Sequence, residues 1–553
     1  MNASLKIYCK NIQEDVAVNG GDSLLDVLGT LNLNMQPVCA LVNNKARSLG
    51  FKIYGPKQVE FLDYSHPTGA RAYVHSLCMV LYKAITDLYP GKRLRIEHSL
   101  KGGYYCRIKH NHENISSEMI ATLKTRMQEI IAQDLPFVRH EEPTQDVVKI
   151  FEAQGLNDKV RVFSTCSDIY SVYYTLDGLA DAFYGPLAPS TGILKVFDLQ
   201  PYEQGMILLA PDKDMKPAVA EKQPKMFQAF TDYVAFNDII GLGDVGILNK
   251  AIREKKAPML INVAEALHNK MFAAIAHDIA QRYQAGGARV VLIAGPSSSG
   301  KTTSSKRLAI QLVTNYIMPK VIELDNYFVN RDKTPRDESG EYDYESLYAL
   351  DLEQFNSDLT RLLAGEEVAM PTYNFTTGSR EYRGNTLKLE KNNILLIEGI
   401  HGLNPELTKQ IPEEQKFRLY VSALTTLSID DHNWIPTSDN RLLRRIVRDN
   451  KYRGSNAQST IARWASVRRG EDKWIYPFQE NADATFNSSL IFELAVMKMH
   501  AEPVLRQVPV NSPEYSEAYR LLKFLNYFEP LDEKDIPSTS LLREFLGGSS
   551  FTY

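Results

Sequence analysis

An apolar run of five residues, Val290–Ala294, leads directly into a glycine loop that opens a helical segment. The loop has the pattern G-x-x-x-x-G-K-[ST], with fixed positions Gly295, Gly300, Lys301 and Thr302. The glycines let the backbone turn tightly, so successive N–H groups point at one anion, and the helix start adds partial positive charge. We expect Lys301 to reach the terminal phosphates of ATP and the Thr302 hydroxyl to ligate Mg²⁺. The predicted nucleotide-binding residues are Gly295, Ser297, Ser298, Ser299, Gly300, Lys301, Thr302 and Thr303.

Composition sets broad limits on the rest of the chain. A length of 553 residues predicts about three or four domains. The formal net charge of −4 gives no support to a broad nucleic-acid footprint. All five cysteines precede the glycine loop and form no C-x-x-C pair, which argues against a zinc site and fits a reducing cytoplasm. The N-terminus lacks the apolar core of a signal peptide and no apolar run has membrane-spanning length, so we expect a cytoplasmic protein without membrane contact.

The order of elements predicts a multidomain α/β protein. Strands alternate with helices over 288–505, the pattern of a parallel sheet covered by helices on both faces. The stretch 226–287 has the apolar spacing of helices and is predicted to be a helical connector. Residues 506–553 are predicted to form a C-terminal helical tail.

Two acidic residues follow predicted strands of this sheet. Lys320–Leu324 ends in Asp325, and Asn393–Ile397 ends in Glu398. In an open parallel sheet, ligands gather outside the carboxyl ends of the strands, where both acids would lie. Phosphoryl transfer to an alcohol needs a metal clamp and a carboxylate that accepts the hydroxyl proton. We expect Thr302 and Glu398 to supply the metal environment and Asp325 to be the base, with a second role toward Mg²⁺; the alternative is that both acids only cap strand ends.

A group of cations follows later in the chain. Arg441, Arg445 and Arg448 have i, i+4, i+7 spacing and therefore share one helix face. A lid that places arginines over transferring phosphates would meet the electrostatic demand of the reaction. For Arg444 we expect a solvated position. Further arginines of the group are Arg453, Arg463, Arg468 and Arg469.

Over 288–500 the sequence resembles the uridine kinase and phosphoribulokinase family of P-loop kinases. The landmarks are GPSSSGKTT, LDNYF, YDYESLYALDLEQF, MPTYNFTTGSR, ILLIEGIHGLN and RLLRRIVRDNKYRG, in the order and spacing of the family. The resemblance implies Asp325, Lys301, Arg448 and Arg453 as catalytic residues. It implies Glu345, Tyr373, Arg445 and Arg448 around the substrate, and Thr302, Glu398 and Asp325 around the metal.

The departures from this family lie on the acceptor side. Uridine kinases usually carry aspartate where this chain has Glu345, histidine where it has Gly378, and arginine where it has Ser455. A polar site that loses a partner can lose orders of magnitude in selectivity. We therefore expect a kinase for a nucleoside, uridine and also cytidine, with another small alcohol or a sugar phosphate as the alternative acceptor.

The front of the chain resembles modules of threonyl-tRNA synthetases. Residues 1–62, with three predicted strands and the helix LLDVL, resemble the ubiquitin-like TGS domain, which implies a β-grasp fold. Residues 63–225 resemble the second additional domain of the synthetases, which implies an α+β fold. The four positions of the editing constellation hold Arg71, His75, Phe183 and Leu187. Three have lost their chemistry, so we expect no editing activity and a structural role for His75.

This likeness leaves further alternatives open for the front half. One is an RNA- or tRNA-linked regulator in which the kinase fold acts as an ATP-dependent switch. Another is a module that dimerises or senses a small ligand. We expect the protein to be a homo-oligomer. The cations that RNA would contact are Lys92, Arg93, Arg95, Lys101, Arg107 and Lys109. We expect this charge run to be a solvated surface instead.

Overall fold

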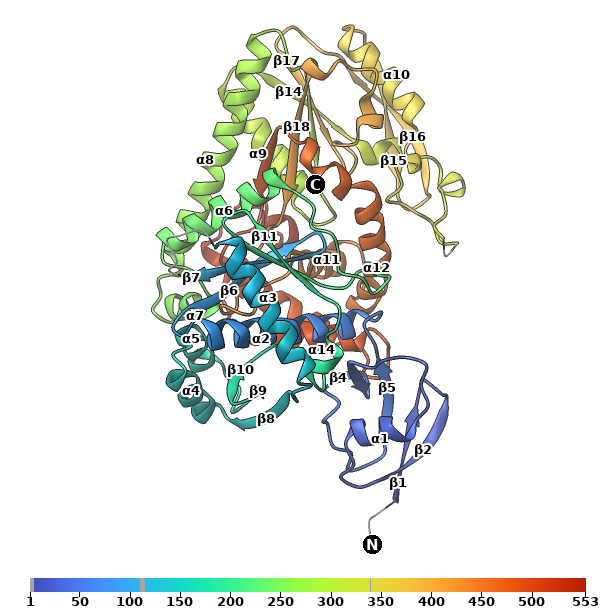
Figure 1. Ribbon diagram of the computed structural model, residues 1–553. Helices are drawn as coiled ribbons and strands as arrows, with labels where there is room; N and C mark the ends of the chain where they lie inside the picture. The colour runs from blue at the N-terminus through green and yellow to red at the C-terminus, as the bar shows by residue number, and fades with distance from the viewer. Residues whose placement is uncertain (1–3, 110–114, 339) are drawn as a thin grey trace.

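The computed structural model describes residues 4–109, 115–338 and 340–553 (Figure 1). The chain is a multidomain α/β protein, and its largest parallel sheet follows two smaller sheet regions along the sequence. Among the described residues, every helix is too short or too polar to span a lipid bilayer.

The N-terminal module is a five-stranded sheet that packs on one short helix. The strand order is β2-β1-β5-β3-β4, with β1 and β5 parallel. Ser23 caps the helix because its side chain accepts from the Asp26 N–H, and the Asp26 carboxylate accepts from the Ser23 N–H in return. The elements are β1 (Ser4–Cys9), β2 (Glu14–Asn19), α1 (Leu24–Thr30), β3 (Cys39–Val42), β4 (Lys45–Arg47) and β5 (Gln58–Leu62).

Two antiparallel sheets and four helices form the middle region, residues 63–225. One sheet has the order β11-β12-β7-β6 and the other β10-β9-β8. Helix α2 is buried over most of its length, because both sheets and the C-terminal helices pack around it. The strands are β6 (Arg93–Leu100), β7 (Gly103–Lys109), β8 (Val138–Pro143), β9 (Tyr170–Leu176), β10 (Leu179–Asp181), β11 (Asp198–Tyr202) and β12 (Gly205–Leu209). The helices are α2 (Pro67–Leu88), α3 (Ser117–Ala132), α4 (Thr144–Ala153) and α5 (Asn157–Thr165).

The large sheet has the order β14-β17-β13-β18-β19, and all its pairings are parallel. Side chains alternate across it: Val291 and Ile293 of β13 pack on α8 and α9, whereas Val290 and Leu292 pack on α10. Both faces are covered, as the sequence predicted (Figure 1). The strands are β13 (Val290–Ala294), β14 (Met318–Glu323), β17 (Asn393–Glu398), β18 (Lys416–Ser422) and β19 (Ala484–Asn487), and the hairpin β15 (Val368–Asn374) and β16 (Ser379–Leu387) lies beside α10.

The predicted helical connector, 226–287, contributes to the layer that covers the large sheet. Its long helix α8 (Ala257–Gln284) places Phe272, Ile275 and Ile279 in the core on one face of the sheet. The other helices before and around the sheet are α6 (Pro224–Ile239), α7 (Val245–Arg253), α9 (Lys301–Thr314) and α10 (Leu352–Leu363). Short 3₁₀ helices connect elements at η1 (Thr191–Ile193), η2 (Leu324–Tyr327), η3 (Arg331–Lys333), η4 (Leu347–Ala349), η5 (Pro405–Thr408), η6 (Glu413–Gln415), η7 (Tyr476–Asn481) and η8 (Glu533–Asp535).

The C-terminal helices join the middle region to the large sheet. One continuous apolar cluster contains side chains of α2, α3, α11, α13, α14 and α15. The N-terminal module also contacts this part, because the Asn44 amide donates to the backbone oxygens of Val510 and Ser512. These helices are α11 (Thr437–Tyr452), α12 (Ala457–Trp474), α13 (Glu493–Leu505), α14 (Tyr515–Leu525) and α15 (Arg543–Leu546).

The segment 428–435, which leads into α11, is inserted into the middle region. Trp434 packs on His75 with ring centroids 5.6 Å apart, and His432 Nδ1 lies 2.7 Å from Asp181 Oδ2. His75 is 3% exposed, and burial lowers its pKa to about 3, so this side chain is a neutral core residue. Phe183 stacks on the other side of His75 at 5.4 Å. The place of the editing constellation is therefore filled by protein.

Candidate nucleotide and phosphoryl-transfer site

The glycine loop has the conformation that its sequence predicts. A Cβ atom on Gly295 would lie 2.0 Å from the Val421 carbonyl oxygen, so no larger residue fits there. Gly300 has φ +85° and is the residue directly before α9, and Ser298 also has a positive φ of 58°. These left-handed residues turn the loop back on itself at the carboxyl end of β13.

Buried groups hold the loop from behind by its carbonyl oxygens. Arg441 Nε donates to Ser297 O at 2.9 Å, Arg444 Nη1 lies 3.4 Å from Ser298 O, and the Ser488 hydroxyl donates to Ser299 O. Two N–H groups of the loop also have acceptors within the protein: that of Ser297 donates to Glu471 Oε1 at 3.1 Å, and that of Ser299 to Pro296 O at 3.2 Å.

The expected position of Arg444 was wrong. Arg444 is fully buried and pairs with Glu493, with 2.6 Å between Nη2 and Oε2. Arg441 is also fully buried and pairs with Glu471, so it supports the loop from below and does not belong to an exposed lid. The spacing of arginines along α11 did not reveal this, because their burial depends on the glycine loop and α13, which are far from α11 in the sequence.

The predicted acids and the loop lysine meet at the carboxyl edge of the sheet. Glu398 is the last residue of β17, and Asp325 follows β14 inside η2. Thr302 Oγ1 lies 3.4 Å from Glu398 Oε2. Burial raises the pKa of Glu398 to about 7, and nearby Asp325 adds to this rise while Lys301 opposes it. Desolvation by the surrounding protein likewise raises the pKa of Asp325.

Lys301 is close enough to both acids to be influenced by their charge. Its Nζ donates to Pro296 O at 3.2 Å. Desolvation lowers the pKa of Lys301, and Glu398 and Asp325 counteract this effect. The three groups therefore lie close enough to influence one another electrostatically.

Three of the predicted arginines gather around one aspartate of α11. Arg448 Nη2 lies 2.7 Å from Asp449 Oδ1, Arg445 Nε lies 3.4 Å from Oδ2, and Arg453 Nε lies 3.7 Å from Oδ1. Arg445 also donates to the Ser297 hydroxyl of the loop at 2.8 Å. Arg448 and Arg453 oppose the raised pKa of Asp325, so the arginine cluster faces the predicted base.

On the acceptor side, Tyr373 is 7% exposed and packs between Phe328 and Phe375, at ring distances of 5.6 and 5.1 Å. Its backbone N–H donates to Asn326 Oδ1, directly after Asp325 in the chain. Glu345 is half-buried against Gly470 of α12, and burial raises its pKa while Arg445 opposes the rise.

Gly378 lies at the tip of the β15–β16 hairpin with φ +69°. A Cβ atom there would be 2.8 Å from Arg331 Nε, because the Arg331 side chain fills the space beside it. Arg331 donates to Phe375 O at 2.6 Å and is exposed, and none of the ion pairs of the described residues includes it. The position where uridine kinases carry histidine is therefore covered by a guanidinium.

The oxygen set at this edge suits Mg²⁺. Thr302 contributes a hydroxyl, and Glu398 and Asp325 contribute carboxylates, all hard donors. Within the described residues, no group of three or more His, Cys, Asp and Glu side chains is arranged to hold a metal alone. Mg²⁺ bound by one or two carboxylates and substrate phosphates does not need such a group.

Sequence reasoning missed residues of the C-terminal tail. Glu544 Oε2 accepts from both the N–H and the hydroxyl of Thr303, at 3.2 and 2.6 Å. The hydroxyl of Tyr553 lies 2.8 Å from the Thr303 hydroxyl. The contact joins residues more than 240 positions apart, and LLREFLGGS carries no local signal for it.

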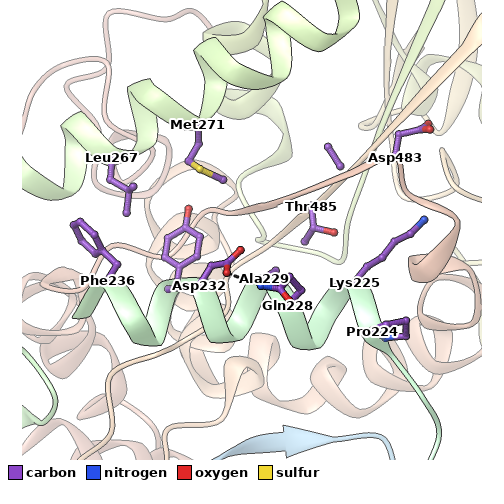
Figure 2. A pocket seen from close by; sticks show the side chains of 12 residues that line it. Pro224, Lys225, Gln228, Ala229, Asp232, Phe236, Leu267, Met271, Asp483 and Thr485 are labelled. Carbon is purple, nitrogen blue, oxygen red and sulfur yellow. Dashed lines mark hydrogen bonds between the residues drawn. The ribbon is translucent and has the colours of Figure 1, made fainter. Parts of the chain in front are cut away.

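A separate cavity of about 430 Å³ lies between α6, α8 and β19. Figure 2 shows Phe236, Leu267 and Met271 around it, and the cationic residue in its lining is Lys225. Lys225 Nζ donates to Glu480 O and Ala482 O. This cavity therefore offers no free cation for a phosphate.

Within the basic stretch of the middle region, Lys92 and Lys101 are exposed, as expected for a solvated surface, and Arg95, Arg107 and Lys109 pair with acidic residues. Arg95 is 5% exposed and lies 3.2 Å from Glu97, which also pairs with Arg107. Lys109 Nζ lies 2.9 Å from Asp431 of the inserted segment. Lys109 thus links the middle region to the inserted segment, whereas Arg107 and Glu97 pair within the middle region. All five cysteines are free.

Parts of this chain are similar to known proteins. Residues 290–491 match the model of the Phosphoribulokinase / Uridine kinase family. The front half is similar to threonine–tRNA ligases. The ligase of Clostridium kluyveri is 27% identical over 198 residues, which cover 35% of this chain and 31% of the ligase. The ligase of Francisella tularensis subsp. novicida is 26% identical over 181 residues, which cover 32% of this chain and 28% of the ligase. The chain thus spans less than a third of the length of these curated relatives.

Two solved structures are similar to parts of this chain. One is a putative fructose transport system kinase from Silicibacter sp. TM1040, which is 21% identical with a TM-score of 0.29. The similarity covers 39% of this chain and 98% of that chain. The other is a possible uridine kinase from Bacillus stearothermophilus, which is 21% identical with a TM-score of 0.25. The similarity covers 36% of this chain and 89% of that chain. At these TM-scores the likeness carries no argument about activity.

Proposed function

We propose that this chain, whose residues 290–491 form a domain of the phosphoribulokinase/uridine kinase family, is an ATP-dependent kinase that phosphorylates a hydroxyl of uridine, and of cytidine as a second nucleoside. The observation that supports the proposal most is the meeting of Lys301, Thr302, Asp325 and Glu398 at one edge of the parallel sheet.

The residues of the site have separate tasks in this reaction. Asp325 accepts the proton of the acceptor hydroxyl, whose oxygen forms a bond to the γ-phosphorus of ATP. The bond from the γ-phosphorus to the β–γ bridging oxygen breaks, and ADP leaves with that oxygen. Lys301, Arg448 and Arg453 counter the negative charge of the phosphoryl group. Thr302 and Glu398 would hold Mg²⁺, which supplies charge neutralisation for the phosphates.

An acceptor screen tests this proposal. Full-length protein is incubated with ATP, Mg²⁺ and single nucleosides, and products are separated by chromatography. We expect uridine monophosphate from uridine and none in the Lys301→Ala variant. A chain that binds ATP but forms no nucleoside monophosphate from any nucleoside would contradict the nucleoside assignment.

A second candidate is a kinase of the same mechanism whose acceptor carries an anionic group, such as a sugar phosphate. Arg331 favours it, because this guanidinium lacks an acidic partner among the described residues and covers Gly378 beside Tyr373. The same screen with sugar phosphates decides between the two. Arg331→Ala should then raise KM for an anionic acceptor and leave it unchanged for a nucleoside. Arg383→Ala is the control, because Arg383 is an arginine of the hairpin that Arg331 contacts and it pairs with Glu381.

A further inference from the structure

The end of the chain returns to the start of the glycine-loop helix. Figure 1 shows the C-terminus beside the large sheet, far from the N-terminal module. In this position the Glu544 carboxylate accepts both Thr303 donors, and the Tyr553 hydroxyl lies 2.8 Å from the Thr303 hydroxyl. The Lys306 ammonium lies 5.7 Å from the centre of the Tyr553 ring.

The Thr303 donors belong to the predicted anion site. Thr303 is the third residue of α9, and the first N–H groups of a helix have no partner within the helix. A phosphate is the ligand such groups bind best, because the helix start also carries partial positive charge. Glu544 therefore places a carboxylate on donors that a nucleotide phosphate would use.

The charge of Glu544 also affects the protonation of Lys301 and Glu398. It counteracts the lowering of the pKa of Lys301, and it contributes to the raised pKa of Glu398. A bound triphosphate would meet this negative charge in addition to those of Asp325 and Glu398. Leaving the carboxylate in place would thus oppose phosphate binding both by occupying the donors and by repulsion.

The segment is buried in the core at its start and exposed to solvent at its end. Leu541, Leu542, Phe545 and Leu546 are buried, and the Phe545 ring lies 5.1 Å from the Arg444 guanidinium. After them, Gly547 and Gly548 have φ +88° and +71°, and Tyr553 is 57% exposed. The Glu544 side chain and residues 547–553 can leave Thr303 while the buried anchor stays in the core.

We propose that the C-terminal segment 544–553 is an autoinhibitory element of the nucleotide site, in which Glu544 competes with a nucleotide phosphate for the donors of Thr303. Binding of ATP displaces the Glu544 carboxylate and the Tyr553 hydroxyl. This inference rests on the proposed ATP site.

Nucleotide affinity tests the competition. Titration calorimetry compares ATP, ADP and adenosine on the wild type, Glu544→Gln, Glu544→Ala and the control Asp535→Asn, which removes one exposed charge from the same tail without touching Thr303. We expect both Glu544 variants to bind ATP about tenfold more tightly, since a hydrogen bond to a charged group is lost from the competing state. Adenosine affinity and the Asp535→Asn variant should stay at the wild-type value.

Hydrogen exchange gives a second readout on the unaltered protein. Amides of 547–553, including the Ser550 N–H that donates to Ser538 O, should exchange faster when ATP is bound. Equal ATP affinity in the wild type and both Glu544 variants, or slower exchange with ATP, overturns the autoinhibitory role alone. Absence of ATP binding in every variant instead overturns the proposed nucleotide site.

Discussion

At the scale of single residues, Arg444 shows how a charge can be structural in a catalytic domain. It is fully buried, pairs with Glu493 and contacts Ser298 of the glycine loop. Its removal would leave a carboxylate without its partner in a place that water does not reach. Removing one partner of a buried ion pair lowers the free energy of unfolding far more than removing one partner of a surface pair.

We therefore expect Arg444→Met to lower the free energy of unfolding by about 3–5 kcal/mol. The exposed Arg463 on α12 provides the matched control, and Arg463→Ala should change stability by less than about 0.5 kcal/mol. Chemical denaturation followed by circular dichroism measures both. Equal stability of the two variants would show that the Arg444–Glu493 pair contributes little.

The place of the glycine loop and of both acids at one edge of the sheet could be predicted from the sequence, because each follows a strand. Parallel strands bring their carboxyl ends to one edge, so Asp325 and Glu398 were expected beside Lys301. The roles of these residues stay predictions until they are tested. Glu544 and the buried side of α11 were not predictable, because both depend on contacts between segments far apart in the chain.

At the scale of elements, the inserted segment 428–435 fixes the start of α11. Lys159, fully buried, lies 2.8 Å from Asp181 and 3.0 Å from Asp430. Burial alone would lower the pKa of His432, but Asp181 outweighs it and the pKa of His432 is raised. The segment therefore couples the middle region to the helix that holds the glycine loop.

This network predicts a pH dependence of stability. A histidine with a raised folded-state pKa contributes stability below its ordinary pKa of about 6.5, and this contribution is lost as the pH rises through the folded-state value. We expect the melting temperature of the wild type to fall, relative to that of His432→Gln, as the pH rises from 6 through the folded-state pKa of His432. The control His277→Gln, on the exposed side of α8, should follow the wild type. A constant difference between wild type and His432→Gln across this range would rule out the coupling.

At the scale of the whole molecule, the likeness to two protein classes does not mean separate units. One apolar cluster runs from α2 of the middle region to α15 at the end of the chain. Helix α8, which precedes the glycine loop, covers one face of the large sheet. A large apolar interface of this kind favours a single rigid body.

A fragment that begins at residue 288 should therefore fail to fold. It lacks Phe272, Ile275 and Ile279, which cover the sheet, and the middle region that packs on α11 and α14. We expect no cooperative thermal transition and no ATP binding from this fragment, whereas a fragment from residue 224 should retain helical secondary structure. A cooperative melt of the 288–553 fragment would show that the front half is dispensable for folding.

The charge distribution makes a prediction about RNA. Because Arg95, Arg107 and Lys109 are engaged by Glu97 and Asp431, we expect no salt-dependent binding of tRNA to the full chain at low ionic strength. Filter binding between 50 and 200 mM salt measures this. Affinity that falls steeply with salt would instead support an RNA-linked regulator. A homo-oligomer also stays a prediction, and light scattering of the purified chain tests it.

The central claim is that Asp325 faces an ATP-filled glycine loop and accepts the proton of the acceptor. The most direct test compares Asp325→Asn with the wild type in steady-state phosphoryl transfer and in ATP binding by calorimetry. We predict a loss of kcat by at least about a hundredfold with ATP affinity within about twofold of the wild type, since general-base catalysis contributes about 10²–10⁴-fold. Unchanged kcat, or loss of ATP binding equal to the loss of turnover, would contradict the account.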